Sequence, residues 1–177
     1  MSRDEDSRVA GRGAGPTEEQ TRSKPALLCR LGGELCALPL SCVAEIMRPL
    51  PIARLEHAPA FVLGLAVVRG EPIPVIDGAG LLGARPLDAR DPPAAPARFV
   101  TLKVGSRRVA LAVADVLGLH DLSSLSLGAL PPLLAQAETN AIAAVGERDR
   151  QLLLVLEGAR AVPAAAWAAL ETVRATS

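Results

Sequence analysis

Cysteine and histidine are the residues of this chain best suited to metal binding or nucleophilic chemistry, and they are few. The three cysteines (Cys29, Cys36 and Cys42) follow neither a CxxC pattern nor a zinc-binding spacing. His57 lies in a turn flanked by prolines, and neither it nor His120 has a second ligand at metal-binding spacing. We therefore expect free thiols, two ordinary surface histidines, no metal and no other cofactor.

Motifs of hydrolases and of P-loop nucleotide binding are also absent, since no GxSxG, P-loop or HExxH pattern occurs. The glycine-rich run at 11–15 follows no strand and so lacks the context of a phosphate-binding loop. The acidic residues are scattered and suggest no general acid/base pair. A net charge of +0 and 2% aromatic residues disfavour nucleic acid as the main partner. The sequence thus indicates a binding protein that is not an enzyme.

The N-terminal segment 1–25 mixes charges of both signs with small polar residues and has no hydrophobic period, so we expect a disordered tail. It contains no apolar region of a signal peptide. The longest apolar stretch, 58–68, is far shorter than the roughly 20 residues of a membrane helix. These features predict a cytoplasmic protein with no direct membrane insertion.

The second half of the chain contains a clear hairpin signal. Val100, Leu102 and Val104 alternate with Thr101 and Lys103 before Gly105-Ser106, and Val109, Leu111 and Val113 resume the period of two after it. A two-residue turn there pairs Leu102 with Val109, so that apolar residues face each other and charged residues face water.

The first half repeats this pattern over 27–31 and 36–40, around Gly32-Gly33. The two-residue register makes Cys29 and Cys36 cross-strand neighbours on one buried face, where they act as small hydrophobes. A constant offset superposes the two hairpins, which suggests duplication and favours two small β-lobes of similar plan.

Other segments carry weaker signals. The proline-rich segment 85–98 reads as a solvent-exposed connection between the halves. Pro39, Pro72 and Pro74 within apolar runs predict short edge strands. Residues 152–156 are expected to form a buried closing strand, and helices are expected near 130–137 and 163–174.

The most informative stretch, 43–77, resembles the first half of CheW-like domains at separate points. VAEI at 43–46 is similar to their strand with an acidic residue followed by Ile, and APAFVLG at 58–64 to their proline-centred turn. RGEPIPVID at 69–77 resembles their RGxxxPVxD hallmark. The resemblance continues in 109–119 and 146–156, and together these pieces span 26–160.

The resemblance implies a mainly β fold of two small SH3-like barrels enclosing a shallow hydrophobic groove, with a short C-terminal helix. The lobes would be about 26–84 and 99–160, joined by the loop 85–98 and followed by 161–177. Such domains are non-enzymatic adaptors in bacterial chemotaxis. They bind the cytoplasmic helical tip of a chemoreceptor and the regulatory domain of a CheA-type histidine kinase, and are recruited to membrane receptor arrays.

Carried over by position, the resemblance also implies roles for individual residues. The receptor face would include Val43, Glu45 and Ile46, with Arg69 at or near it. Gly64 and Gly70 would permit backbone turns, and Asp77 would close a strand end. Plainer roles stay open: Ile46 in the core, Glu45 simply solvated, and Arg69 bonding loop carbonyls.

Two departures from the family pattern keep other functions open. Val67 stands where the family usually has a hydrophilic residue, and Cys36 where an aromatic one is often found. A CheW-like module of another pathway, such as motility, pilus function or development, is one alternative. A small β-barrel enzyme is the other.

Overall fold

The computed structural model describes residues 23–56, 58–83, 96–129 and 141–157, together with 162 and 167. Several expectations lie wholly or mostly outside these residues: the tail 1–25, the loop 85–98, His57 and the helices at 130–137 and 163–174. The described residues are mainly strand, in a six-stranded and a five-stranded sheet. The predicted mainly β fold is confirmed.

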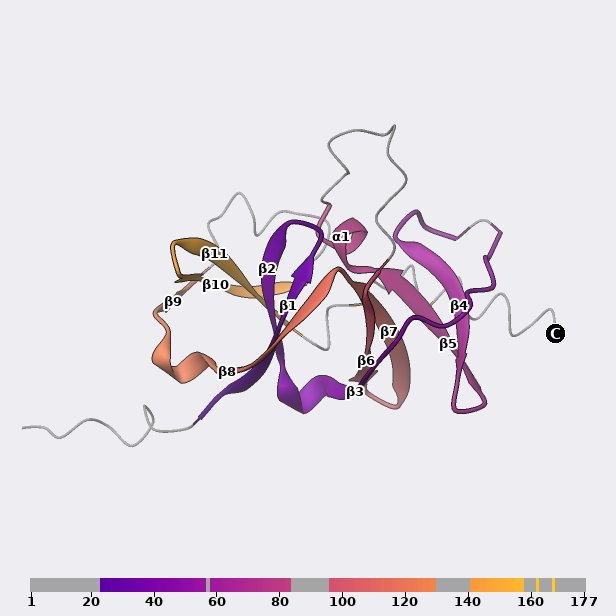
Figure 1. Cartoon of the computed structure of the whole chain (residues 1–177), viewed down its shortest axis with the longest axis horizontal. Helices are drawn as coiled ribbons and strands as arrows, with labels where there is room; N and C mark the ends of the chain where they lie inside the picture. Colours follow the sequence, from indigo (N-terminus) through magenta and orange to yellow (C-terminus); the bar gives the residue numbers. More distant parts are fainter. Residues whose placement is uncertain are drawn as a thin grey trace, which may run out of the picture.

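Two sheets lie side by side in Figure 1. Sheet A is ordered β8-β1-β2-β11-β10-β9, and its strands are β1 (Pro25–Leu31), β2 (Glu34–Pro39), β8 (Asp115–Asp121), β9 (Leu127–Gly128), β10 (Ile142–Arg148) and β11 (Gln151–Leu156). Sheet B is ordered β3-β6-β7-β5-β4, and its strands are β3 (Val43–Met47), β4 (Val62–Val68), β5 (Glu71–Asp77), β6 (Arg98–Val104) and β7 (Arg107–Val113). Short helical turns are η2 (Leu40–Cys42), α1 (Gly78–Leu81) and η3 (Leu122–Ser124).

Both hairpin registers are confirmed. Cys29 lies opposite Cys36 in the β1–β2 pair, and Leu102 lies opposite Val109 in the β6–β7 pair. The expected closing strand is β11, which pairs in parallel with β2 in the interior of sheet A. Alternation of apolar residues about a two-residue turn was sufficient to set these registers.

Each sheet is buried on both faces, because the molecule has three hydrophobic clusters. The largest lies between the sheets and contains Cys29 and Leu27 from sheet A with Leu102 and Val100 from sheet B. A second cluster fills the other face of sheet A, and a third, around Phe99, fills the other face of sheet B. The two lobes thus share a core besides having one each.

Neither sheet is built from one half of the chain alone. The strand β3, from the first half, leaves its own hairpin and pairs with β6 of sheet B. The strand β8, from the second half, pairs with β1 of sheet A. The segments 26–84 and 99–160 therefore exchange one strand each, and a division into contiguous lobes does not describe the sheets.

The exchange is symmetric, which supports a duplicated plan. The β3–β6 ladder has a bulge between Val43 and Glu45, and the β8–β1 ladder has a register shift at the corresponding point. The β4–β5 turn has positive φ at Arg69 (51°) and Gly70 (82°), and the β10–β11 turn repeats this at Asp149 and Arg150. Positive φ at both central residues is the signature of a type I′ hairpin turn.

The edge-strand expectation drawn from the prolines is wrong both for β2, which carries Pro39 and lies between β1 and β11, and for β5. This strand carries Pro72 and Pro74, yet it lies between β7 and β4. Its pairing with β7 begins only at Val75, so both prolines stand where β4 is its one paired neighbour. A proline is tolerated where no ladder partner needs its missing N–H.

Candidate functional site

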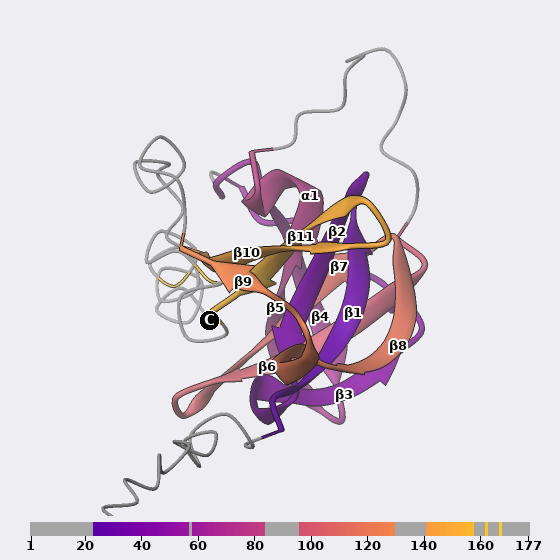
Figure 2. The same cartoon turned by 90° about the vertical axis from the view of Figure 1, so that its left-hand side faces the viewer.

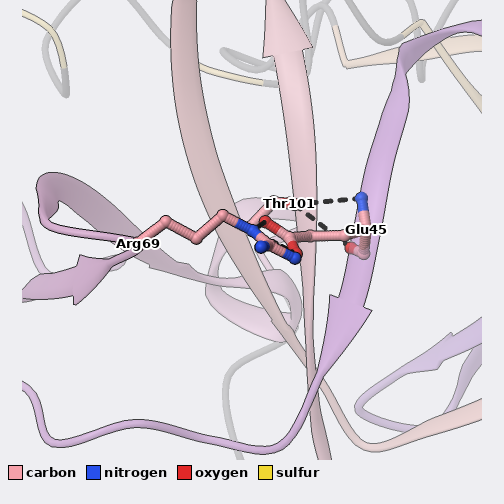
Figure 3. A network of polar contacts seen from close by, with 3 residues as sticks. All are labelled: Glu45, Arg69 and Thr101. Carbon is pink, nitrogen blue, oxygen red and sulfur yellow. Dashed lines mark hydrogen bonds and ion pairs between the residues drawn. The ribbon is translucent and has the colours of Figure 1, made fainter.

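An exposed ion pair joins β3 to the β4–β5 turn. The Arg69 guanidinium donates from Nη2 to Glu45 Oε2 at 2.8 Å, and from Nε to the same oxygen at 3.1 Å and to Oε1 at 3.3 Å. Figure 3 shows the guanidinium and the carboxylate facing each other across the space between the two segments. Planar guanidinium–carboxylate contacts of this kind are directional as well as charged.

The backbone of Glu45 is fixed by Thr101 on the neighbouring strand β6. The Thr101 hydroxyl accepts from Glu45 N at 3.1 Å and donates to Glu45 O at 3.2 Å, as Figure 3 shows. This threonine is 1% exposed and is the buried polar residue of the described part of the chain. Because the β3 bulge leaves backbone groups without ladder partners, a hydroxyl at this point satisfies them inside the core.

The ion pair connects the two edges of sheet B. Glu45 lies on one edge strand, β3, and Arg69 follows the other, β4. The sheet curls around the cluster of Phe99, so the pair bridges its edges at one end of the lobe. The side chain of Arg69 is 75% exposed and that of Glu45 is 23% exposed, which leaves the guanidinium accessible to a partner.

The electrostatics of the pair are reciprocal. The hydrogen bonds from Arg69 lower the pKa of Glu45, with smaller contributions from the charges of Arg69 and Arg108. The same contact raises the pKa of Arg69. In the described residues the hydrogen bonds of Arg69 go to Glu45 and not to loop carbonyls, so the purely loop-bonding role considered for it is not what the structure shows.

Val43 and Ile46 lie on the other face of β3 from Glu45. Val43 is opposite Leu102 and Ile46 is opposite Val100, so both point toward the cluster between the sheets. Val43 is half-buried against that cluster, whereas Ile46 is 44% exposed at its rim. The edge strand therefore offers an apolar side and a charged side.

Two exposed residues that the sequence did not single out lie on the matching strand β8. Leu119 is 66% exposed and Leu117 is 45% exposed, and Leu119 corresponds to Ile46 under the hairpin offset. Both β3 and β8 lie on the side of the molecule facing the viewer in Figure 1, which is the right-hand side of Figure 2. The alignment of the two halves was the signal that could have found them.

Gly70 lies in the β4–β5 turn and Asp77 ends β5, whereas Gly64 lies inside β4 at its bulge and not in a turn. At Gly64 φ is 140°, and a side chain there would overlap the carbonyl oxygen of Ala53. Gly70 supplies the second positive φ of the β4–β5 turn. Asp77 caps α1 by accepting from Ala79 N at 3.1 Å.

The thiols are positioned as core residues. Cys29 and Cys36 are buried and, like Cys42, unbridged. Burial raises the pKa of Cys29 to about 12 and that of Cys36 further, which keeps both protonated and unreactive. In the part of the chain that the structure describes, no group of three His, Cys, Asp or Glu side chains is arranged to hold a metal ion.

Comparison with known proteins defines the class. The family model of the CheW-like domain matches residues 25–165, and the chain belongs to this family. A probable chemotaxis protein CheW of Rhizobium etli is 33% identical over 95 residues, which are 52% of this chain and 59% of that protein. The chemotaxis protein CheW of Rhizobium meliloti is 32% identical over the same shares. The match thus spans less than two thirds of the curated relatives.

The fold comparison agrees with the family. The crystal structure of the scaffolding protein TtCheW from Thermoanaerobacter tengcongensis aligns with a TM-score of 0.65 at 20% identity, covering 77% of this chain and 90% of that one. This confirms the expected two-lobed CheW-like architecture. Within the described ranges, no helix is both long and apolar enough to cross a membrane.

Proposed function

We propose that this protein is a non-enzymatic adaptor that couples chemoreceptors to a CheA-type histidine kinase in chemotaxis signalling. One observation carries the proposal: an exposed, preorganised ion pair joins Arg69 of the β4–β5 turn to Glu45 on the edge strand β3, whose other side presents Ile46. Membership of the CheW-like family and relatives named as chemotaxis proteins support the same role.

The partner we assign to this surface is the cytoplasmic helical tip of a chemoreceptor. A helix that binds in a groove needs exposed apolar anchors framed by a few charges. Ile46 on β3 and the leucines Leu117 and Leu119 on β8 are exposed and provide such anchors. The two strands lie on the same side of the molecule (Figure 1 and Figure 2). Arg69 and Glu45 provide the charges, and Val43 supports β3 from the core.

The second partner in this proposal is the regulatory domain of the kinase, bound through a different surface. The protein would work in the cytoplasm and be recruited to membrane receptor arrays through the receptor. These parts of the proposal rest on the family and on the names of the relatives.

A CheW-like module of another signalling pathway is the second candidate function. Val67, two residues before Arg69, is 64% exposed, so this rim carries an apolar side chain next to the ion pair. An apolar side chain beside the ion pair, where the family usually has a hydrophilic one, favours a different binding partner. No observation in the described residues favours the third possibility, a small β-barrel enzyme.

A charge swap tests the receptor site. Arg69→Glu and Glu45→Arg should each weaken binding to a soluble chemoreceptor cytoplasmic fragment by about 1–3 kcal/mol, or roughly 5- to 150-fold. The double variant restores an ion pair in reverse, so it should recover the melting temperature but not the affinity. Calorimetric binding and thermal unfolding measure both, and wild-type affinity in all three variants would refute the proposed site.

A further inference from the structure

Two cationic side chains lie opposite each other next to the Glu45–Arg69 ion pair. Lys103 on β6 and Arg108 on β7 are directly opposite in the register. We call sheet A with its own cluster lobe A, and sheet B with the cluster around Phe99 lobe B. Lys103 and Arg108 continue the face of Thr101 and Ala110, so they lie at the same end of lobe B as Glu45. Lys103 is exposed and Arg108 half-buried. Like charges directly opposite on a sheet destabilise it.

Among the described residues, the acidic groups at this end do not neutralise the two cations. Glu45 is already bound by Arg69, although Arg108 is close enough for its charge to help lower the pKa of Glu45. Glu71 begins β5 on the same face, but among the described residues no ion pair joins it to Lys103 or Arg108.

The duplicated half of the molecule shows that the fold does not require these charges. The positions corresponding to Lys103 and Arg108 are Arg30 and Leu35, which also pair directly. There the single cation is satisfied, because Arg30 donates to Gln151 Oε1 at 3.3 Å and to the Gly33 carbonyl at 3.5 Å. The repulsion between Lys103 and Arg108 therefore costs stability at a place where the equivalent pair, Arg30 and Leu35, does not. A role of the two cations in binding explains this cost.

We propose that Lys103 and Arg108 bind acidic side chains of the partner helix that docks at the Glu45–Arg69 pair. The inference rests on the proposed function, since it assumes that this end of lobe B faces the receptor. It adds the chemistry of the partner: carboxylates on the helix surface that meets the β6–β7 hairpin. Arg107 is excluded from this set because it lies on the opposite face, 5.1 Å from the ring centroid of Trp167.

The test uses the full chain and a soluble chemoreceptor cytoplasmic fragment from the same organism. Lys103→Glu replaces repulsion with attraction to Arg108, so the melting temperature should stay constant or rise by about 1–2 °C. Affinity for the fragment should nevertheless fall about 10-fold at low salt, and by less at about 200 mM salt, where rim charges are screened. Arg108→Glu should lower affinity similarly.

Arg30→Glu is the matched control, because it makes the same charge change at the equivalent place in lobe A. It should leave affinity within about 2-fold of the wild type. Unchanged affinity in Lys103→Glu and Arg108→Glu, with binding still weakened by Arg69→Glu, would overturn this inference and leave the proposed function standing. Unchanged affinity in all of them would overturn both, and an equal loss in Arg30→Glu would overturn the assignment to lobe B.

Discussion

The two lobes repeat one plan but differ in chemistry at equivalent places. In lobe B the bulged edge strand carries Glu45, held by Thr101 and Arg69. At the equivalent ladder in lobe A, Gly118 lies opposite Leu28, an apolar pair with no side-chain hydrogen bond to offer. The bulge therefore belongs to the fold, whereas the polar network belongs to lobe B alone. The polar network is therefore a local feature of one sheet and not a requirement of the shared plan, although it still contributes to the stability of that sheet.

The largest expected effect tests whether the lobes are independent. Phe99→Ala empties the centre of the lobe B cluster, where Phe99 is 0% exposed, and should cost about 3–5 kcal/mol. Because both lobes share the cluster between the sheets, the loss should appear in one cooperative transition. Urea unfolding followed by far-UV circular dichroism and by Trp167 fluorescence measures this, and two separated transitions would contradict it.

The next effect separates the polar network from its apolar counterpart. Thr101→Val leaves the backbone N–H and C=O of Glu45 without their partner in a buried place, at an expected cost of about 1–3 kcal/mol. Leu28→Val, at the equivalent position in lobe A, removes only one methylene and should cost about 1 kcal/mol. Chemical denaturation of both variants decides the comparison; equal costs would mean that the hydroxyl adds nothing.

The turns offer a smaller contrast. Arg150 holds φ at 63° in lobe A, where the equivalent residue of lobe B is Gly70. A non-glycine residue in this conformation is strained, so Arg150→Gly should stabilise the protein by about 0.5–1 kcal/mol. Gly70→Ala should destabilise it by about 1 kcal/mol. Opposite shifts of the melting temperature are the expected result, and shifts of the same sign would show that the turns are not equivalent.

The smallest effect is a pH dependence. Because Arg69 lowers the pKa of Glu45 in the folded state, the pair stabilises the protein above the unfolded pKa of about 4.3. That contribution is lost as the pH falls through the lower, folded pKa. Glu45→Gln should remove this part of the acid destabilisation, while Asp121, whose pKa is lowered mainly by the Ser23 hydroxyl, keeps its own. Melting temperatures between pH 6 and pH 3 measure the difference, and identical pH profiles would contradict it.

Local sequence patterns predicted the pairing of strands that are neighbours along the chain. Period-two alternation and two-glycine or Gly-Ser turns set the pairing of Cys29 with Cys36 and of Leu102 with Val109. The exchange of β3 and β8 could not be read in this way, because alternation says which face a strand buries and not which hairpin it joins. Pro72 led to a wrong prediction of an edge strand for a similar reason. A proline shows that a backbone N–H is missing at one position, but it does not show where the strand lies in the sheet.

The candidate site was predicted in part. The resemblance brought Glu45 and Arg69 to one surface, and the structure joins them directly. Ile46 points to the other face of β3 by ordinary alternation with Glu45, and the bulge between Val43 and Glu45, which the sequence did not reveal, puts Val43 on the face of Ile46. Thr101 was missed, since a threonine within a hydrophobic strand carries no signal of the strand it will meet.

The exchanged strands also have a consequence for synthesis. A ribosome that has released the chain through α1 has supplied β1 to β5, yet β3 still lacks β6, and β1 still lacks β8. Hairpins can form early, but each sheet waits for residues of the second half. Folding must therefore follow translation of most of the chain, dominated by contacts between distant segments. We expect the nascent first half to expose unpaired strand edges and to depend on chaperones more than a lobe of contiguous sequence would.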